Sequence, residues 1–351
     1  MSHYLYTVSN RQSANSVVGM EILDTGGLRP VPGSPFPTGG KGSRSSQSQN
    51  GLWIDRGRLY AVDFGSGSLA IFRPNPDGTL TRLNKTPVSS RGVSPCSVCV
   101  SGGILYVVNQ HIRSSGGKAE PNLAVFAVEG DKVRYLPRSS FKLRRGESPT
   151  QAIVNPQGTV LAVPSVRARK SLLHGYAIDR RAASSGRLLT ELGQSPLEIT
   201  DTGFGFGSVW KSDGQTLFMT NAVGSGSVVR LTVDAASGRI TETARATTPG
   251  NACWAAFSSD ERRLYVANLL SLLVFDVSDT RLAQIQSLEV SDVSLPVLRD
   301  LILGPDGKFL YALEQRKRRI LAYSVDADGR VALSSELAVG VAGNTLGLAI
   351  A

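Results

Sequence analysis

The segment VLRDLILGPDGKFLYALEQRKRRILAYSV (residues 297–325) contains three β-strand patterns separated by two turns, and it decides the fold. Its Pro-Asp-Gly turn lies between two apolar runs, which is a hairpin signal, because proline fixes φ and glycine takes a left-handed conformation. Related turns occur at Asn155–Gly158 and Lys211–Gly214. A further turn at Asp326–Gly329 and a strand from Arg330 complete a unit of four strands.

The second strand of this unit carries a motif, hydrophobic-Tyr-hydrophobic-Val-polar, that recurs along the chain. Its copies are Leu5–Ser9, Leu59–Asp63, Leu105–Asn109, Leu161–Ser165, Leu217–Asn221, Leu264–Asn268 and Leu310–Glu314. The final residues lie 54, 46, 56, 56, 47 and 46 positions apart. Self-similarity at such a period indicates a propeller or another repeat array. Four strands in each of seven repeats predict an all-β, seven-bladed propeller of four-stranded antiparallel blades, with residues 1–351 as one domain.

The two ends of the chain predict how the ring closes. The chain begins almost at a second strand, so the first blade lacks its innermost strand. The segment Thr345–Ile350 is an apolar run with no motif behind it. We expect this run to complete the first blade, because pairing there removes two exposed sheet edges.

Cysteine usage and the start of the chain predict a cytoplasmic protein. The three cysteines cannot all pair with one another, and no secretory hydrophobic segment precedes Tyr4. Cys96 and Cys99 are three residues apart within a predicted strand, so they face opposite sides of the sheet. We therefore expect buried structural thiols, with neither a metal nor another cofactor. We also expect a monomer without membrane attachment.

The net charge is +10, and the excess is clustered at Arg138–Arg145, Arg167–Lys170 and Arg316–Arg319. The last two clusters fall between second and third strands, whereas the first lies in an outer strand or at its exit. A basic surface attracts nucleic acids or acidic ligands. These clusters lack the interleaved aromatic residues that single-strand binding uses. A solvated basic rim is therefore favoured over nucleic-acid binding.

The polar residues that end the seven motif copies are expected to form a ring near the mouth of the central channel. We call this set the motif-end ring: Ser9, Asp63, Asn109, Ser165, Asn221, Asn268 and Glu314. The structural interpretation is that they satisfy backbone groups at strand ends. The functional interpretation is that Asp63 and Glu314 transfer protons, while Asn109, Asn221 and Asn268 bind substrate.

Histidine is scarce in this chain. His3 is terminal, and His174 begins a predicted third strand, away from the channel. His111 follows the third motif copy and is placed near the mouth, so it is the one plausible histidine base. The Gly-rich stretch Phe204–Gly207 leads into a strand rather than a helix, so it lacks the helix N-terminus that binds phosphate. Close backbone packing near the channel explains its glycines better.

The chain resembles the lactonase family of seven-bladed propellers, which includes bacterial phosphogluconolactonase and fungal carboxymuconate cyclase. The resemblance covers essentially the whole chain. It rests on HYLYTVSN (residues 3–10), GLRPVPGSPFPTG (residues 27–39), NPQGTVLAVPS (residues 155–165), SDGQTLFMTN (residues 212–221) and GPDGKFLYALE (residues 304–314). It implies the propeller fold and a site for a small acidic or cyclic metabolite at the channel mouth.

Most of the mouth residues that this resemblance implies are replaced. Positions where the family carries histidine, arginine or glutamate are occupied here by Thr150, Phe206, Gly207, Ala222, Ala256 and Leu269. Arg299 matches the arginine that enters the inner strand of the seventh blade, where it can bind a carboxylate or phosphate through two hydrogen bonds. The resemblance therefore indicates a divergent member with a remade site.

Three functions follow as alternatives. The first is a lactonase-like hydrolase or ring-forming isomerase, with Arg299 holding the anion and Glu314, Asp63 or His111 transferring protons. The second is a non-catalytic propeller that binds an apolar ligand, a peptide or a protein, suggested by apolar residues such as Phe206 and Trp254. The third is a cyclase for a hydrophobic metabolite, in which shape and desolvation replace a charged catalytic set.

Overall fold

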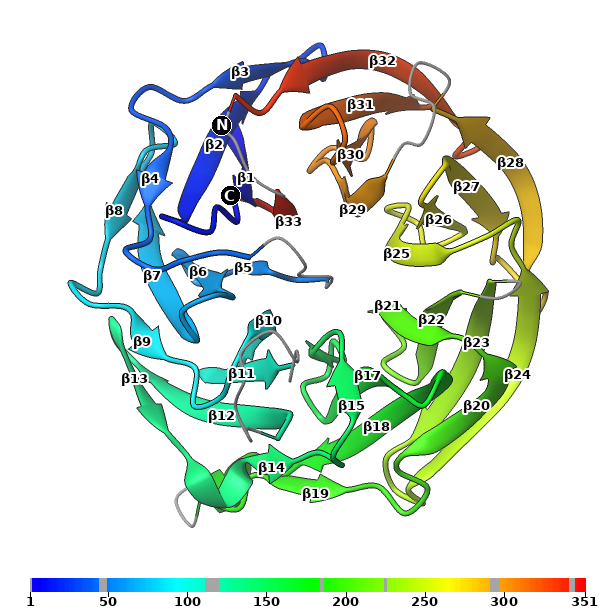
Figure 1. Ribbon diagram of the computed structural model, residues 1–351. Helices are drawn as coiled ribbons and strands as arrows, with labels where there is room; N and C mark the ends of the chain where they lie inside the picture. Colours follow the sequence, from blue (N-terminus) through cyan, green and yellow to red (C-terminus); the bar gives the residue numbers. More distant parts are fainter. Residues whose placement is uncertain are drawn as a thin grey trace.

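The computed structural model is a ring of seven antiparallel β-sheets around a central axis (Figure 1). It describes residues 2–43, 49–110, 120–183, 186–223, 226–290, 297–340 and 345–351. The predicted all-β, seven-bladed architecture is confirmed, and within the described residues the helical segments are two short 3-10 turns, Pro137–Ser139 and Arg180–Ala183. The predicted closure is also confirmed, because the last strand pairs with the first one.

Each blade runs from an inner strand at the axis to an outer strand at the rim. Blades 1 and 2 are β33 (Leu346–Ile350), β1 (His3–Val8), β2 (Ser16–Ile22), β3 (Leu28–Pro30) and β4 (Phe36–Pro37), then β5 (Leu52–Asp55), β6 (Arg58–Asp63), β7 (Ser68–Pro74), β8 (Leu80–Arg82) and β9 (Val88–Ser89). Blade 3 is β10 (Pro95–Ser101), β11 (Ile104–Asn109), β12 (Asn122–Glu129), β13 (Lys132–Tyr135) and β14 (Phe141–Lys142).

The remaining blades follow the same plan, with extra short strands in blade 4. Blade 4 is β15 (Glu147–Pro149), β16 (Ile153–Val154), β17 (Val160–Arg167), β18 (Lys170–Ile178), β19 (Leu189–Glu191) and β20 (Leu197–Thr202). Blade 5 is β21 (Phe204–Trp210), β22 (Thr216–Ala222), β23 (Ser227–Asp234) and β24 (Arg239–Thr247). Blades 6 and 7 are β25 (Ala252–Phe257), β26 (Arg263–Asn268), β27 (Ser271–Asp276) and β28 (Ala283–Glu289), then β29 (Leu298–Leu303), β30 (Phe309–Glu314), β31 (Arg319–Val325) and β32 (Val331–Ala338).

The tyrosine of the repeated motif holds neighbouring blades together. Tyr6 of β1 donates its hydroxyl hydrogen to Gly78 O in blade 2, at 2.9 Å, and Tyr311 of β30 donates to Gly26 O in blade 1, at 3.2 Å. Both glycines have positive φ and lie beneath an aromatic ring, so a Cβ atom would not fit at either position. Not every second strand makes this contact: the hydroxyls of Tyr106 and Tyr265 have no hydrogen-bond partner among the described residues, and blades 4 and 5 have Ala162 and Phe218 at the same position.

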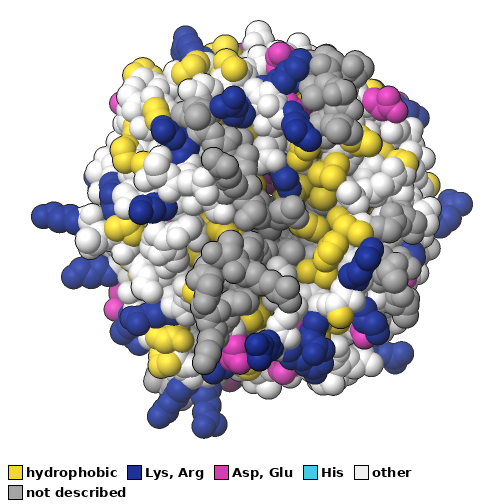
Figure 2. All heavy atoms as spheres, in the orientation of Figure 1, with side chains coloured by type: hydrophobic (Ala, Val, Ile, Leu, Met, Phe, Trp, Pro, Cys, Tyr) yellow, Lys and Arg dark blue, Asp and Glu magenta, His cyan; other side chains and the backbone are white. Residues whose placement is uncertain are grey.

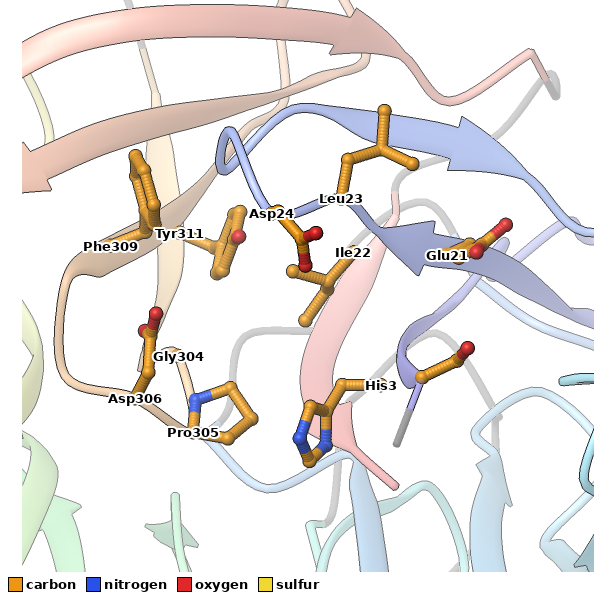
Figure 3. Close-up of a pocket in the computed structure, with 11 residues that line it drawn as sticks. His3, Glu21, Ile22, Leu23, Asp24, Gly304, Pro305, Asp306, Phe309 and Tyr311 are labelled. Atoms are coloured by element: carbon orange, nitrogen blue, oxygen red, sulfur yellow. The ribbon is translucent and has the colours of Figure 1, made fainter.

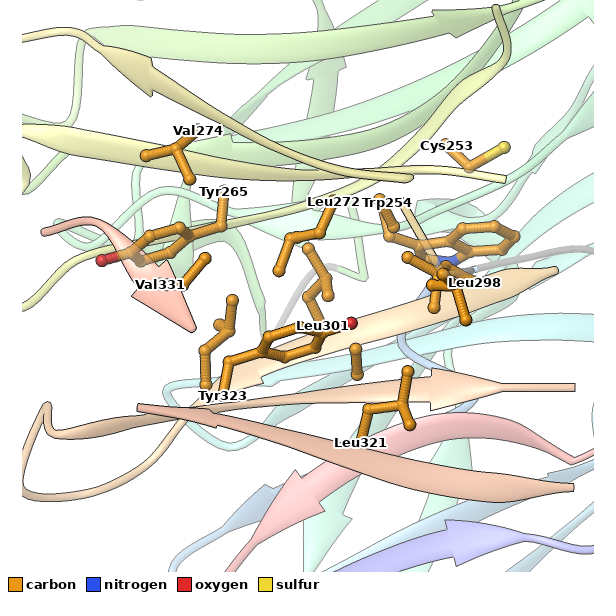
Figure 4. Packing of buried hydrophobic residues seen from close by; sticks show 14 of the residues in the cluster. Cys253, Trp254, Tyr265, Leu272, Val274, Leu298, Leu301, Leu321, Tyr323 and Val331 are labelled. Atoms are coloured by element: carbon orange, nitrogen blue, oxygen red, sulfur yellow. The ribbon is translucent and has the colours of Figure 1, made fainter. Parts of the chain in front are cut away.

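The core lies between the blades and consists of several apolar clusters. The cluster between blades 6 and 7 contains Trp254, Tyr265, Leu298 and Leu301, all less than 5 % exposed (Figure 4). Aromatic side chains of this size contribute most of the buried apolar area in such layers. Cys253 and Trp254 lie at one end of the cluster, where β25 begins, so this core continues to the mouth of the channel.

Candidate functional site

The inner strands carry β-bulges at the same place in several blades. The register of pairing between the inner and second strands shifts by one residue in blades 3, 5, 6 and 7. The shifts lie at Cys96 in β10, Phe206–Gly207 in β21, Cys253 in β25 and Arg299 in β29. Each bulge begins beside the inner-strand residue that pairs with a motif-end residue; in β29, for example, Leu298 pairs with Glu314. Bulges redirect side chains and are frequent next to active sites. These bulge positions therefore place non-repeating side chains around the mouth.

Arg299, Trp254 and Phe206 lie together at the mouth, as three of the predicted binding residues. The Arg299 guanidinium carbon is 5.7 Å from the centre of the Trp254 ring, and Phe206 is 6.0 Å from the same ring, centroid to centroid. Phe204 extends the aromatic wall, 6.5 Å from Phe206. A guanidinium above an aromatic face is attracted by the ring quadrupole, which orients the cation without neutralising it.

The charge of Arg299 is not balanced by a carboxylate among the described residues. Its Nε donates to Gln315 Oε1 at 2.9 Å, and the ion pairs within that part of the chain do not include it. Partial burial lowers the pKa of Arg299 below its usual value, with the nearby Cys253 thiol acting in the opposite direction. An arginine keeps its charge under such conditions. Its two Nη groups can therefore bind a ligand anion through parallel hydrogen bonds.

The cysteines are free and buried, as predicted. Burial raises the pKa of the Cys253 thiol to about 12, although Arg299 lowers it slightly, and burial also raises the pKa of Cys99 to about 12. A thiol in this state is a poor nucleophile. Groups of three or more His, Cys, Asp or Glu side chains that could hold a metal ion are absent from the residues that the structure describes.

The motif-end ring lies beneath the mouth, with each of its seven side chains at most 2 % exposed. Asp63 accepts hydrogen bonds from Thr38 Oγ1 at 2.6 Å and Asn15 Nδ2 at 2.9 Å, so it joins blade 2 to blade 1. Burial raises the pKa of Asp63, and hydrogen bonds from Thr38, Asn15 and Ser68 oppose that rise. This geometry favours the structural interpretation for Asp63; its proton-transfer role stays a prediction.

Glu314 and the three asparagines are also enclosed by protein groups. Glu314 Oε1 accepts the backbone N–H of Arg316 at 2.8 Å, and its Oε2 accepts that of Lys317 at 2.9 Å. The asparagine side-chain amides donate locally: Asn109 to Ser90 O, Asn221 to Ser227 Oγ and Asn268 to Ser271 Oγ. The contacts of Asn221 and Asn268 hold the turns that follow their strands, whereas that of Asn109 holds the connection between blades 2 and 3. Substrate binding by these asparagines stays a prediction.

A short segment between blades 1 and 2, Gln49–Gly51, crosses the axis of the ring. Gln49 Nε2 donates to Ala255 O of blade 6 at 3.0 Å. Asn50 O accepts the N–H of Val98 in blade 3 at 2.8 Å. We call Gln49–Gly51 the crossing segment; Gln49 and Asn50 also line a pocket beside the inner strands β5, β29 and β33, which we call the lower chamber.

Two glycines make room for the crossing segment. A Cβ atom at Gly207 of blade 5 would lie 2.3 Å from Gln49 Oε1, and one at Gly347 of blade 1 would lie 3.3 Å from Gly51 Cα. The prediction of close backbone packing in Phe204–Gly207 is therefore confirmed. The crossing segment itself was not predicted, because its sequence carries no strand or motif signal.

The lower chamber has a volume of about 260 Å³ and contains a buried carboxylate that sequence reasoning missed. Its walls come from β5, β29 and β33, and its lining residues include Trp53, Ile54, Asp300, Ile302 and Ile350. Asp300 Oδ1 accepts the N–H of Leu301, and Oδ2 accepts that of Leu348, both at 2.9 Å. Burial raises the pKa of Asp300 to about 7, while these two backbone hydrogen bonds lower it.

The face that holds the mouth is rich in exposed basic side chains (Figure 2). They belong to turns between second and third strands and to connections between blades: Arg11, Lys41, Arg91, Arg144, Arg145, Arg167, Arg169, Arg316, Lys317 and Arg318. The predicted position of Arg167–Lys170 and Arg316–Arg319 between second and third strands is confirmed. Figure 2 also shows apolar side chains gathered on the side of the mouth formed by blades 5 to 7. This distribution attracts anions toward an apolar wall.

A larger crevice, of about 610 Å³, opens between blades 1 and 7 on the opposite face (Figure 3). Glu21, Asp24 and Asp306 line it together with His3, from the turns β2–β3 and β29–β30 and from β1. Glu21 is already paired with Arg29. The acidic lining makes this crevice unsuitable for an anionic ligand, so it is not the site that the sequence predicts.

The family resemblance implies charged residues at several positions where this chain has other residues. Several of these replacement residues have structural roles. Thr150 donates its hydroxyl hydrogen toward Gly205 O and Phe206 O, at 2.9 and 3.0 Å, and so joins blade 4 to the bulge of blade 5. Ala222 is buried, and Ala256 and Leu269 pack against the core between blades 6 and 7. His111 lies outside the described residues.

Comparison with known proteins supports the fold. No family model and no curated protein matches the chain. Among solved structures it resembles the periplasmic gluconolactonase PpgL of Pseudomonas aeruginosa, with a TM-score of 0.79, 17 % identity and coverage of 100 % of this chain and 99 % of that one. A putative 6-phosphogluconolactonase from Bacteroides fragilis gives a TM-score of 0.76 and 17 % identity, over 99 % and 98 % of the two chains.

A second putative 6-phosphogluconolactonase, from Bacteroides uniformis, gives a TM-score of 0.77 at 17 % identity, over 100 % of this chain and 99 % of that one. The chain therefore has the seven-bladed fold seen in these structures, at low sequence identity to them. Among its described residues, no helix has the length and apolar character needed to cross a bilayer.

Proposed function

We propose that the mouth binds a small metabolite with an anionic group and a ring, and that the protein opens or closes a lactone ring there. One observation carries the proposal: the guanidinium of Arg299 lies over Trp254, beside Phe206, without a carboxylate partner among the described residues. A carboxylate or phosphate would bind its two Nη groups. The ring of the ligand would pack against the aromatic wall.

The same arginine suits the chemistry of a lactone. When water attacks the lactone carbonyl, negative charge develops on the carbonyl oxygen, and fixed N–H donors that point at this oxygen lower the barrier. The ring C–O bond then breaks, and the leaving oxygen takes up a proton as the carboxylate product forms. In the reverse direction, the guanidinium would hold the carboxylate that closes the ring.

The proton-transfer group is assigned within this proposal to His111. Asp63 and Glu314 are fully buried and hydrogen-bonded, so neither side chain faces the mouth. His111 follows Gln110, the last described residue before it, whose side chain donates to Pro149 O of blade 4 at 2.7 Å. A histidine is suited to proton transfer near neutral pH.

The test measures ring opening by proton release in weakly buffered solution. The substrates are sugar-acid lactones with and without a phosphate, and muconolactones. Replacing Arg299 by Ala is expected to lower kcat/KM by about 100-fold or more, because a charged donor to the developing anion is lost. Arg299→Lys keeps the charge but lacks the planar fork, so we expect an intermediate loss.

Arg316→Ala is the matched control, because Arg316 is an exposed arginine of the same blade in the turn after β30. Its kcat/KM should stay within about twofold of wild type, since an exposed surface charge mainly affects encounter. Equal turnover by Arg299→Ala and wild type would overturn the assignment of Arg299. Tight binding of these lactones without turnover would instead favour the non-catalytic propeller.

A further inference from the structure

The lower chamber contains a charged group that the proposed chemistry at the mouth does not use. Asp300 is 3 % exposed, and from the described residues its carboxylate accepts two backbone hydrogen bonds and no side-chain hydrogen bond. The ion pairs formed within the described part of the chain do not include Asp300. A carboxylate withdrawn from water is costly unless a cation or further donors accompany it.

The walls around this carboxylate are mainly apolar. Trp53, Ile54, Ile302 and Ile350 are partly exposed and line the chamber below the crossing segment. The volume of about 260 Å³ corresponds to about eight or nine water molecules at liquid density. A cavity of this size suits a compact organic molecule, with an apolar body against the walls and a polar head at the carboxylate.

The chamber and the cluster around Arg299 are built from different residues. The crossing segment lines the chamber and is held to blade 6 by Gln49 and to blade 3 by Asn50. Arg299 points to Trp254 and Gln315, on the mouth side, and is not among the lining residues of the chamber. Arg299 and Asp300, which are neighbours in β29, therefore belong to different sites: Arg299 to the mouth and Asp300 to the lower chamber.

We propose that the lower chamber is a second binding site, for a small organic ammonium ion with an apolar body, and that Asp300 binds the ammonium group. Each carboxylate oxygen keeps lone-pair capacity after accepting one backbone N–H, so both can accept from an ammonium group. The resulting charge-assisted hydrogen bonds compensate the buried carboxylate. The apolar body gains from burial against Trp53 and the three isoleucines.

Three probes of the same shape separate charge from size: benzylammonium, benzyl alcohol and benzoate. Binding is measured by isothermal titration at about pH 8, where an alkylammonium group stays protonated. We expect benzylammonium to bind at least about tenfold more tightly than benzyl alcohol, because charged hydrogen bonds are stronger than neutral ones. Benzoate should not compete with benzylammonium, since it carries the wrong charge for the chamber.

Two variants locate the site. Asp300→Asn keeps the shape of the side chain and should remove the preference for benzylammonium over benzyl alcohol. Ile302→Trp leaves Asp300 in place and fills the chamber, so it should weaken both ligands by about tenfold or more. Circular dichroism and the urea midpoint report whether each variant is folded, and a variant that fails to fold is replaced by Ile350→Trp.

Equal affinity for benzylammonium and benzyl alcohol in the wild-type protein would overturn the proposal. The same conclusion would follow from benzylammonium binding that neither Asp300→Asn nor a folded chamber-filling variant changes. Asp300 would then be a structural contact between β29 and β33 through the N–H of Leu348.

Discussion

Two sets of residues encircle the axis of this propeller, and they differ in how they repeat. The motif-end ring is chemically similar from blade to blade, with Asn, Asp, Ser or Glu at every copy. The bulge positions of the inner strands are dissimilar: cysteine in blades 3 and 6, Phe-Gly in blade 5 and Arg299 in blade 7. The first set is buried among protein groups, whereas Arg299 is only partly buried and keeps donors available for a ligand.

The difference shows which kind of position carries function in a repeat protein. A residue type that recurs in every blade has a role common to all blades, such as forming hydrogen bonds with the backbone groups at the end of the second strand. A binding site has no such symmetry, so its residues occur once. The repeated polar ring therefore indicates architecture, and the departures from repetition on the inner strands indicate the site.

The largest expected effect concerns the pH dependence of stability and Asp300, the buried carboxylate that follows the bulge at Arg299. Burial raises the pKa of Asp300 from 3.8 to about 7, with the Leu301 and Leu348 N–H groups opposing the rise. The folded state therefore holds a proton that the unfolded state releases above about pH 4. The contribution of Asp300 to stability is present below pH 4 and is lost as the pH rises to 7.

This loss amounts to about 4 kcal/mol, since each tenfold change in proton affinity corresponds to about 1.4 kcal/mol. Urea unfolding of wild type and Asp300→Asn across this range measures it. The stability of wild type relative to the variant should fall with rising pH. A constant difference between the two proteins would show that Asp300 does not bind a proton more tightly in the folded state.

The second effect, of about 3 kcal/mol, is the loss of stability expected for Asp63→Ala. The substitution removes one of the two acceptors of the Thr38 hydroxyl, which also contacts Asn15 O, and one of the two acceptors of the Asn15 amide, which also contacts Val62 O, in a buried place. Urea unfolding measures the change, and Asp328→Ala, at an exposed turn, is the control with an expected change under about 0.5 kcal/mol. Ligand affinity at the mouth should stay unchanged, and a large loss of affinity would instead favour the functional interpretation of Asp63.

The sequence predicted the seven blades and the closure by Thr345–Ile350. These predictions succeeded because the strand motif and the turns are local and repeat, and because inner strands of adjacent blades must converge at the axis. The crossing segment was beyond prediction, since it follows from tertiary contacts with six blades and from glycines at Gly207 and Gly347.

Asp300 and the burial of the motif-end ring were also missed, for a related reason. The pattern of a strand shows which face a residue occupies, but it does not show how deep the residue lies below the mouth. A bulge also shifts the alternation by one residue. The bulge at Arg299 therefore concealed that its neighbour Asp300 belongs to the chamber.

The third effect is smaller and concerns the crossing segment. Gln49→Ala removes the hydrogen bond to Ala255 O, but it also removes Gln49 Oε1, which is buried without a hydrogen-bond partner among the described residues. We expect a net loss of stability of about 1 kcal/mol, measured by urea unfolding. Gln157→Ala is the matched control, because its amide donates to Ser212 O in an exposed turn. An equal effect at both positions would argue against a special role of Gln49 at the axis.

Arg299→Ala is expected to have the smallest effect on stability of these substitutions, although it should have the largest effect on ligand binding. Arg299→Ala loses the hydrogen bond to Gln315 and the stacking on Trp254, but it also removes a partly buried charge without a carboxylate partner. These opposing contributions should leave the free energy of unfolding within about 1 kcal/mol of wild type. A residue kept for ligand binding behaves in this way, because its removal costs function rather than stability. Urea unfolding beside titration with an anionic lactone separates the two outcomes: a loss of several kcal/mol in stability would place Arg299 with Asp63 among the residues that hold the blades together.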